Sequence, residues 1–80
     1  MRTNEQLAGA QRMSEDVRRL LQKNTDAAWR KANELCALAG CAHYTREGER
    51  VNAEQDKENM VNLVFRAYAE KRGLQYAGGA

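Results

Sequence analysis

The sequence contains no proline, a single histidine and only two cysteines, and these shortages narrow the classes of protein to consider. Without proline, and with 42% hydrophobic and 30% charged residues, the composition is that of an ordinary helical domain rather than a disordered chain. No apolar run approaches the roughly 20 residues of a membrane span. Polar residues follow Met1, where a signal peptide would be apolar. We therefore expect a cytoplasmic protein that does not insert into a membrane.

Length and net charge narrow the possible architectures and functions further. Its 80 residues are enough for one small domain, residues 1–80, with a thin core. Chains of this size often oligomerise or dock on a larger partner. The net charge of +2 is too small to indicate nucleic-acid binding by itself, and it excludes a strongly acidic mimic of DNA.

Apolar side chains that recur at helical spacing predict two helices in the first half of the chain. The first spans residues 4–23 and begins at a capping box that Thr3 opens. The second spans residues 26–39, with Thr25 as its N-cap and Gly40 as its left-handed stop. Because only one or two residues separate them, these helices should form a helical hairpin or a corner.

A third helix is predicted over residues 53–72, between a second capping box that begins at Asn52 and a stop at Gly73. Val61 and Phe65 widen its apolar arc to roughly 200°, which is more than packing against one helix requires. Either this helix is central in the fold, or one edge of it is buried in a homodimer or against a partner.

The fold class that follows is all-α, a compact three-helix domain. Residues 40–52, between the second and third helices, are ambiguous, and a short β-hairpin, an irregular loop and a helical turn all remain open. Residues 74–80 are expected to be a flexible, fraying tail. The three apolar stripes predict a core that includes Leu7, Val17, Leu20, Leu35, Met60, Val64 and Tyr68.

Cys36, Cys41 and His43 form the one cluster of this sequence that has metal-ligand chemistry. Zinc requires four ligands, usually in closely spaced pairs, and the C-x4-C-x-H spacing matches no common zinc module. A catalytic Cys–His pair would also need a pocket that so small a core can hardly provide. We therefore expect two reduced thiols, no metal, no cofactor and no enzymatic activity.

Basic residues gather around the first predicted helix and the corner that follows it: Arg12, Arg18, Arg19, Lys23, Arg30 and Lys31. Such a patch can contact phosphates. It can equally be a solvated face, because acidic residues lie three and four positions away and can pair with it. A helix-turn-helix around Gly40 fits poorly, since the segment after this glycine lacks a regular apolar stripe.

The expected function is that of a non-enzymatic protein that binds a larger protein or nucleoprotein complex, because a small chain without a pocket motif acts mainly through its surface. A phage-type inhibitor or adaptor of host machinery, such as a bacterial immune (CRISPR-type) complex, is the specific hypothesis. The alternatives are a small DNA-binding transcriptional regulator and a structural homo-oligomer built on the third helix. The residues expected to bind a partner are Val61, Phe65, Trp29, Arg12, Arg19, Lys23, Arg30 and Lys31.

Overall fold

A computed structural model describes residues 4–41, 50–72 and 76. These residues form helices and connections without a strand, so the predicted all-α class is confirmed for the described part of the chain. Three features expected from the sequence lie wholly or mostly outside it: the capping box opened by Thr3, the alternative β-hairpin, which would fall on residues 42–51, and the stop at Gly73.

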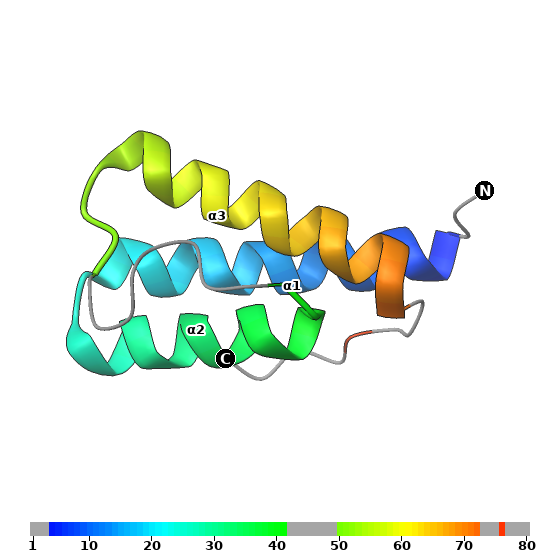
Figure 1. Ribbon diagram of the computed structural model, residues 1–80, viewed down its shortest axis with the longest axis horizontal. Coiled ribbons are helices and arrows are strands. Elements are labelled where there is room, and N and C mark those ends of the chain that lie inside the picture. Colours follow the sequence, from blue (N-terminus) through cyan, green and yellow to red (C-terminus); the bar gives the residue numbers. More distant parts are fainter. Residues whose placement is uncertain (1–3, 42–49, 73–75, 77–80) are drawn as a thin grey trace.

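Three helices make up most of the described chain (Figure 1). In chain order they are α1 (Asn4–Lys23), α2 (Asp26–Ala39) and α3 (Glu54–Ala67), which continues into a π-helical turn, η1 (Tyr68–Arg72). The bounds of α1 and α2 coincide with the ranges expected from the sequence. The third helix begins one residue later than expected, and its last part is η1 rather than α-helix.

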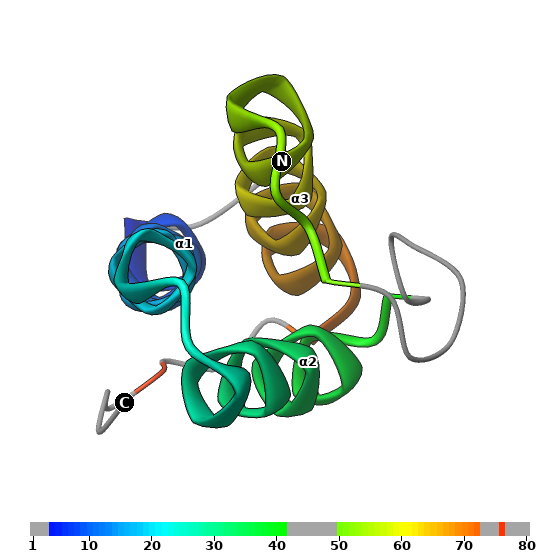
Figure 2. The same ribbon diagram turned by 90° about the vertical axis from the view of Figure 1, so that its left-hand side faces the viewer.

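The helix directions explain the long connection between α2 and α3. α1 runs antiparallel to both other helices, so α2 and α3 point in the same direction (Figure 1). Viewed end-on, the three helices occupy the corners of a triangle (Figure 2). The end of α2 and the beginning of α3 therefore lie at opposite ends of the bundle (Figure 1).

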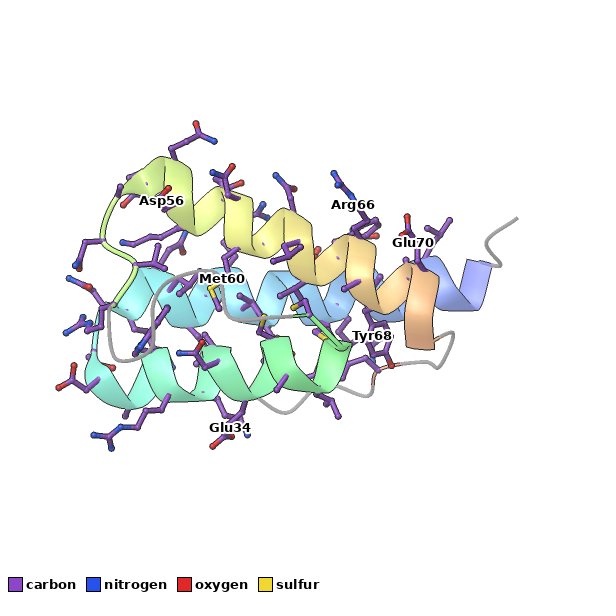
Figure 3. The ribbon with its side chains drawn as sticks, viewed as in Figure 1. Glu34, Asp56, Met60, Arg66, Tyr68 and Glu70 are labelled. Carbon is purple, nitrogen blue, oxygen red and sulfur yellow. The ribbon has the colours of Figure 1, made fainter. Side chains whose placement is uncertain are left out.

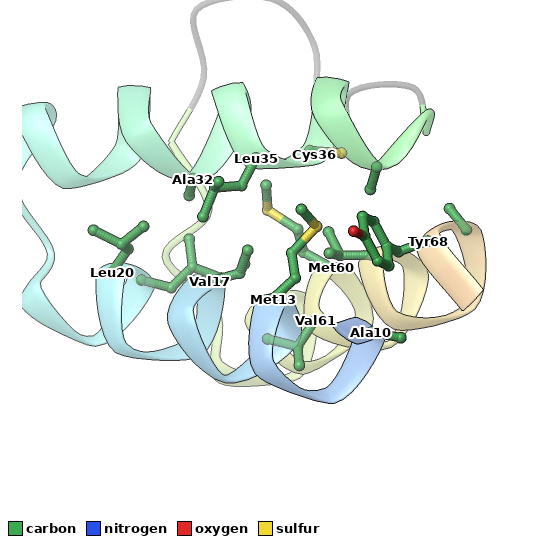
Figure 4. Packing of buried hydrophobic residues seen from close by; sticks show 14 of the residues in the cluster. Ala10, Met13, Val17, Leu20, Ala32, Leu35, Cys36, Met60, Val61 and Tyr68 are labelled. Atoms are coloured by element: carbon green, nitrogen blue, oxygen red, sulfur yellow. The ribbon is translucent and has the colours of Figure 1, made fainter. Parts of the chain in front are cut away.

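The core lies between the three helices. Met60 and Tyr68 are directed into this space, whereas Arg66 and Glu70 project from the outer side of α3 and η1 (Figure 3). α1, α2 and α3 all contribute to one buried cluster (Figure 4). Its largest fully buried side chains are Met13, Met60, Val17, Val64 and Cys36.

Leu7 is the one residue of the predicted core that is not fully buried. The structure buries the other six, Val17, Leu20, Leu35, Met60, Val64 and Tyr68, but leaves Leu7 partly exposed. α1 has 20 residues and α2 has 14, so at about 1.5 Å per residue the beginning of α1 extends past the end of α2. The first turns of α1 therefore have less to pack against (Figure 1).

Local signals set both ends of α2. Thr25 is extended (φ −116°, ψ 159°), and its Oγ1 accepts a hydrogen bond from the Ala28 N–H at 3.1 Å. Gly40 ends the helix in the left-handed conformation with φ 87°. Asn24 also has a positive φ, 55°, a conformation that asparagine tolerates better than most residues. This residue lets α1 turn into α2 within two residues.

The predicted capping box at Asn52 is wrong. α3 begins at Glu54 with Ala53 as its N-cap, and no side chain caps the helix. The Asn52 side-chain amide instead donates to the Arg50 carbonyl oxygen at 3.4 Å. Gln55, the residue expected to reach back, donates to Asn59 within the helix at 3.0 Å. Both polar side chains of the motif are therefore used elsewhere.

The expectation that residues 74–80 form a fraying tail is wrong at Tyr76. Its side chain is 8% exposed and belongs to the buried cluster, where the ring packs against Tyr68 of η1. A large aromatic side chain gains substantial free energy when it leaves water, which is enough to anchor a residue outside any helix. Tyr76 is therefore a core residue.

Candidate partner-binding surface

A hollow of about 620 Å³ opens on the outward side of α2. Residues three and four positions apart share one side of a helix, so α2 supplies a continuous row of lining residues. Glu34, one of this row, projects away from the other helices (Figure 3). The described lining residues are Asp26, Trp29, Arg30, Asn33, Glu34 and Ala37 from α2, and Arg50 from the segment before α3.

Trp29 supplies the aromatic part of this lining. One part of the side chain packs against the core, and the residue also borders the hollow. Asn33 lies one turn further along, and its Nδ2 donates to the Trp29 carbonyl oxygen at 3.3 Å. The Asn33 Oδ1 is buried and accepts no hydrogen bond in the described structure. Trp29 is therefore the residue that supplies apolar area to the lining.

Arg50 closes one end of the hollow. Its guanidinium donates to Asp26 Oδ1 at 3.0 Å and to Asn24 Oδ1 at 2.6 Å. These contacts tie the segment before α3 to the corner between α1 and α2. The partners are 24 and 26 residues away from Arg50 in the sequence. No local pattern could therefore have identified Arg50 as part of this surface.

The charged residues around the hollow are balanced in sign. Asp26 pairs with Arg50, and Glu34 Oε2 lies 3.6 Å from the Lys31 Nζ. Arg30 is exposed and makes no ion pair with any residue that the structure describes. Arg30 is therefore the cation of this lining that is available to an incoming group.

Arg12, Arg19 and Lys23 lie along one exposed stripe of α1, because their spacings of seven and four residues place them on the same side of the helix. Acidic groups interrupt this stripe. Arg19 donates to Asp16, whose side chain is only 4% exposed. The stripe is separate from the hollow, since none of these residues lines it.

Arg18 lies where α1 packs against α3. Its Nε and Nη2 donate to the two carboxylate oxygens of Glu58 at 3.0 and 2.9 Å. These hydrogen bonds lower the pKa of Glu58 and raise the pKa of Arg18. Both side chains are largely exposed, so the pair contributes little to stability. The structure thus assigns Arg18 to a contact between helices.

Val61 and Phe65 lie on the same side of α3 as Glu58, the residue that reaches α1. Val61 is 2% exposed within the single chain, so it presents almost no side-chain area to a partner. Phe65 is half-buried and packs against the core. The wide apolar arc of α3 has an internal explanation, because this helix packs against both α1 and α2.

The structure brings together two of the residues that the sequence predicts to bind a partner, Trp29 and Arg30, in the lining of the hollow. The prediction did not include Asn33, Ala37 or Arg50. The first two have a usable signal, because they follow Arg30 at spacings of three and seven residues on one side of α2.

No protein-family model, curated protein or solved structure matches the chain. None of the described helices is long and apolar enough to cross a membrane. Among the described residues, no group of three or more potential metal ligands is found. His43, the third member of the predicted Cys–His cluster, lies outside these residues.

Proposed function

We propose that this chain is a non-enzymatic binding protein that engages a larger protein through the outward side of α2. The observation that carries the proposal is the hollow of about 620 Å³ in which Trp29 and Arg30 lie together. Tryptophan and arginine are over-represented among the residues that dominate binding energies at interfaces. A hollow beside them can receive a side chain that protrudes from the partner.

The charge around the hollow favours a protein partner over a nucleic acid. Asp26 and Glu34 line it together with Arg30 and Arg50, so a row of phosphates would meet acidic groups as well as basic ones. Leu38, which follows the lining residue Ala37, is 50% exposed and adds apolar area at the same end of α2. Mixed charge around an apolar centre is the usual composition of a protein–protein interface.

A phage-type inhibitor or adaptor of host machinery, such as a bacterial immune complex, is the specific form of this proposal. A protein of that kind acts by occupying a surface of its target and needs no catalytic residue. The small all-α domain with a docking face on one helix is compatible with such a role.

A small DNA-binding regulator is the second candidate, and the stripe formed by Arg12, Arg19 and Lys23 on α1 favours it. Salt distinguishes the two candidates. Binding through six to ten phosphates weakens by roughly 10³–10⁵-fold between about 50 and 200 mM salt. Binding through an apolar centre with a balanced rim changes far less.

The experiment is affinity purification of the tagged chain from its native host, with and without nuclease, at low and high salt. We expect a protein to be retained after nuclease treatment and in high salt, and to be lost from an Arg30→Glu variant. Recovery of nucleic acid alone, released by salt, would instead support the regulator. Recovery of the chain's own copies alone would indicate a homo-oligomer.

A further inference from the structure

α2 ends in a Schellman motif that brings its two cysteines together. Gly40, in the left-handed conformation, donates its N–H to the Ala37 carbonyl oxygen at 3.0 Å. The N–H of Cys41 donates to the Cys36 carbonyl oxygen at 3.2 Å. These two hydrogen bonds define the motif, and the side chains that flank it, here Cys36 and Cys41, commonly contact each other.

The sulfur atoms show this contact. Cys41 Sγ donates to the Cys36 carbonyl oxygen at 3.0 Å, and Cys36 Sγ lies 3.9 Å from the Cys41 carbonyl oxygen. Neither residue is part of a disulfide in the described structure. Cys36 is fully buried against the core (Figure 4), whereas Cys41 is half-buried. Burial, together with the hydrogen bond to the Cys41 side chain, raises the pKa of Cys36 to about 12.

From this arrangement we infer that Cys36 and Cys41 form a dithiol site that reacts with small-molecule disulfides and closes to an intrachain disulfide. A disulfide requires the two Cα atoms to lie within about 4.4–6.8 Å of each other. The hydrogen bond between the two backbones holds these residues at the same turn of chain, which favours that separation. The fold therefore holds the two cysteines close together before any bond forms between them.

Closure takes two exchange steps. Cys41 is the more accessible residue, and its thiolate attacks one sulfur of the small disulfide, which forms a mixed disulfide and releases one small thiolate. Cys36 then gives its proton to solvent and attacks Cys41 Sγ, so that the second small thiolate leaves. Two protein thiols are oxidised, and one small disulfide is reduced to two thiols. Because Cys36 is fully buried, the second step is the slower one.

The closed form would fix the last turn of α2, where Ala37 borders the hollow. This consequence goes beyond the proposed binding function, because closure requires no partner. The bond would resist fraying of the helix end and hold the start of the connection to α3.

The test is equilibration of the purified chain with mixtures of reduced and oxidised glutathione, both folded and in denaturing urea, followed by acid quenching and intact mass measurement. We expect the folded chain to lose about 2 Da, the mass of two hydrogen atoms. At the same glutathione mixture, the ratio of closed to open chain should be at least about tenfold higher in the folded state than in urea.

Two variants serve as matched controls. Cys36→Ala keeps a small apolar side chain at the buried position and should stop at a stable glutathione adduct on Cys41. Cys41→Ala should leave the buried Cys36 unmodified while the chain is folded. The inference is overturned if the folded wild type carries two glutathiones or forms intermolecular dimers without an intrachain bond. It also fails if the closed fraction is no greater in the folded state than in urea.

Discussion

The rings of Tyr68 and Tyr76 pack edge to face, with their centroids 6.2 Å apart and their planes at 74°. The two side chains are 5% and 8% exposed. Burial, and then the negative charge of nearby Asp16, raises the pKa of Tyr76. Tyr76 thus completes the core beside η1, although it lies outside every helix.

Replacement of Tyr76 by alanine should lower the free energy of unfolding by about 3 kcal/mol, because a large buried ring is lost next to a second aromatic. Urea denaturation followed by circular dichroism measures the change. Tyr76→Phe is the matched control, since it keeps the ring and should cost only about 1 kcal/mol. If Tyr76→Ala were as stable as the wild type, Tyr76 would not be part of the core in solution.

The raised pKa of Cys36 predicts a loss of stability in alkaline solution. The folded value is about 12, against 9.0 for an unperturbed thiol, so folding favours the protonated form. This contribution is fully present below pH 9.0 and is lost as the pH rises from there through the folded value. The reduced wild type should therefore lose stability relative to Cys36→Ala over this range. A constant difference between the two proteins would show that Cys36 titrates as an exposed thiol.

Substitution of Val61 tests whether this side of α3 is buried inside the domain or faces a partner. Because it is 2% exposed within the single chain, Val61→Ala should cost about 1–3 kcal/mol of unfolding free energy. Leu38→Ala, at a site that is 50% exposed, should change stability by less than about 0.5 kcal/mol. Phe65→Ala should lower the free energy of unfolding by an amount between these two, because Phe65 is half-buried. Loss of self-association with unchanged stability in Val61→Ala or Phe65→Ala would instead identify this edge of α3 as an interface.

The ion pair of Arg18 and Glu58 predicts that the free energy of unfolding falls slightly in acidic solution. Hydrogen bonding from Arg18 lowers the pKa of Glu58, so its contribution is present above the unperturbed value of 4.5 and is lost as the pH falls through the folded value. Glu58→Gln should flatten this part of the stability curve slightly, and added salt should reduce the difference. An equally steep acid dependence in the variant would show that other carboxylates account for it.

The ends of α2 could be predicted from sequence because their causes are local. A threonine that accepts a hydrogen bond three residues ahead and a glycine with positive φ act through neighbours in the chain. The second capping box shows the limit of this reasoning. Asn52 and Gln55 have the right residue types and spacing, but each finds another partner within reach.

The features that the sequence did not predict depend on contacts outside regular helical spacing. Arg50 reaches residues of the corner between α1 and α2, and Tyr76 reaches Tyr68 from outside the helices. No periodic pattern encodes either contact. The width of the apolar arc on α3 was a real signal, but sequence alone could not decide between packing on two helices and packing on a partner.

The most direct test of the account is the dissociation constant of the co-purified partner protein for four chains: the wild type, Trp29→Ala, Arg30→Glu and Arg66→Glu. Arg66 is exposed on α3 and projects away from α2, which makes it the matched charge-reversal control (Figure 3). Docking on the outward side of α2 predicts a Kd at least about tenfold higher for Trp29→Ala and Arg30→Glu, a loss of roughly 1.4 kcal/mol, with helicity unchanged. Arg66→Glu should bind within about twofold of the wild type. Unchanged affinity in Arg30→Glu and Trp29→Ala would contradict the account.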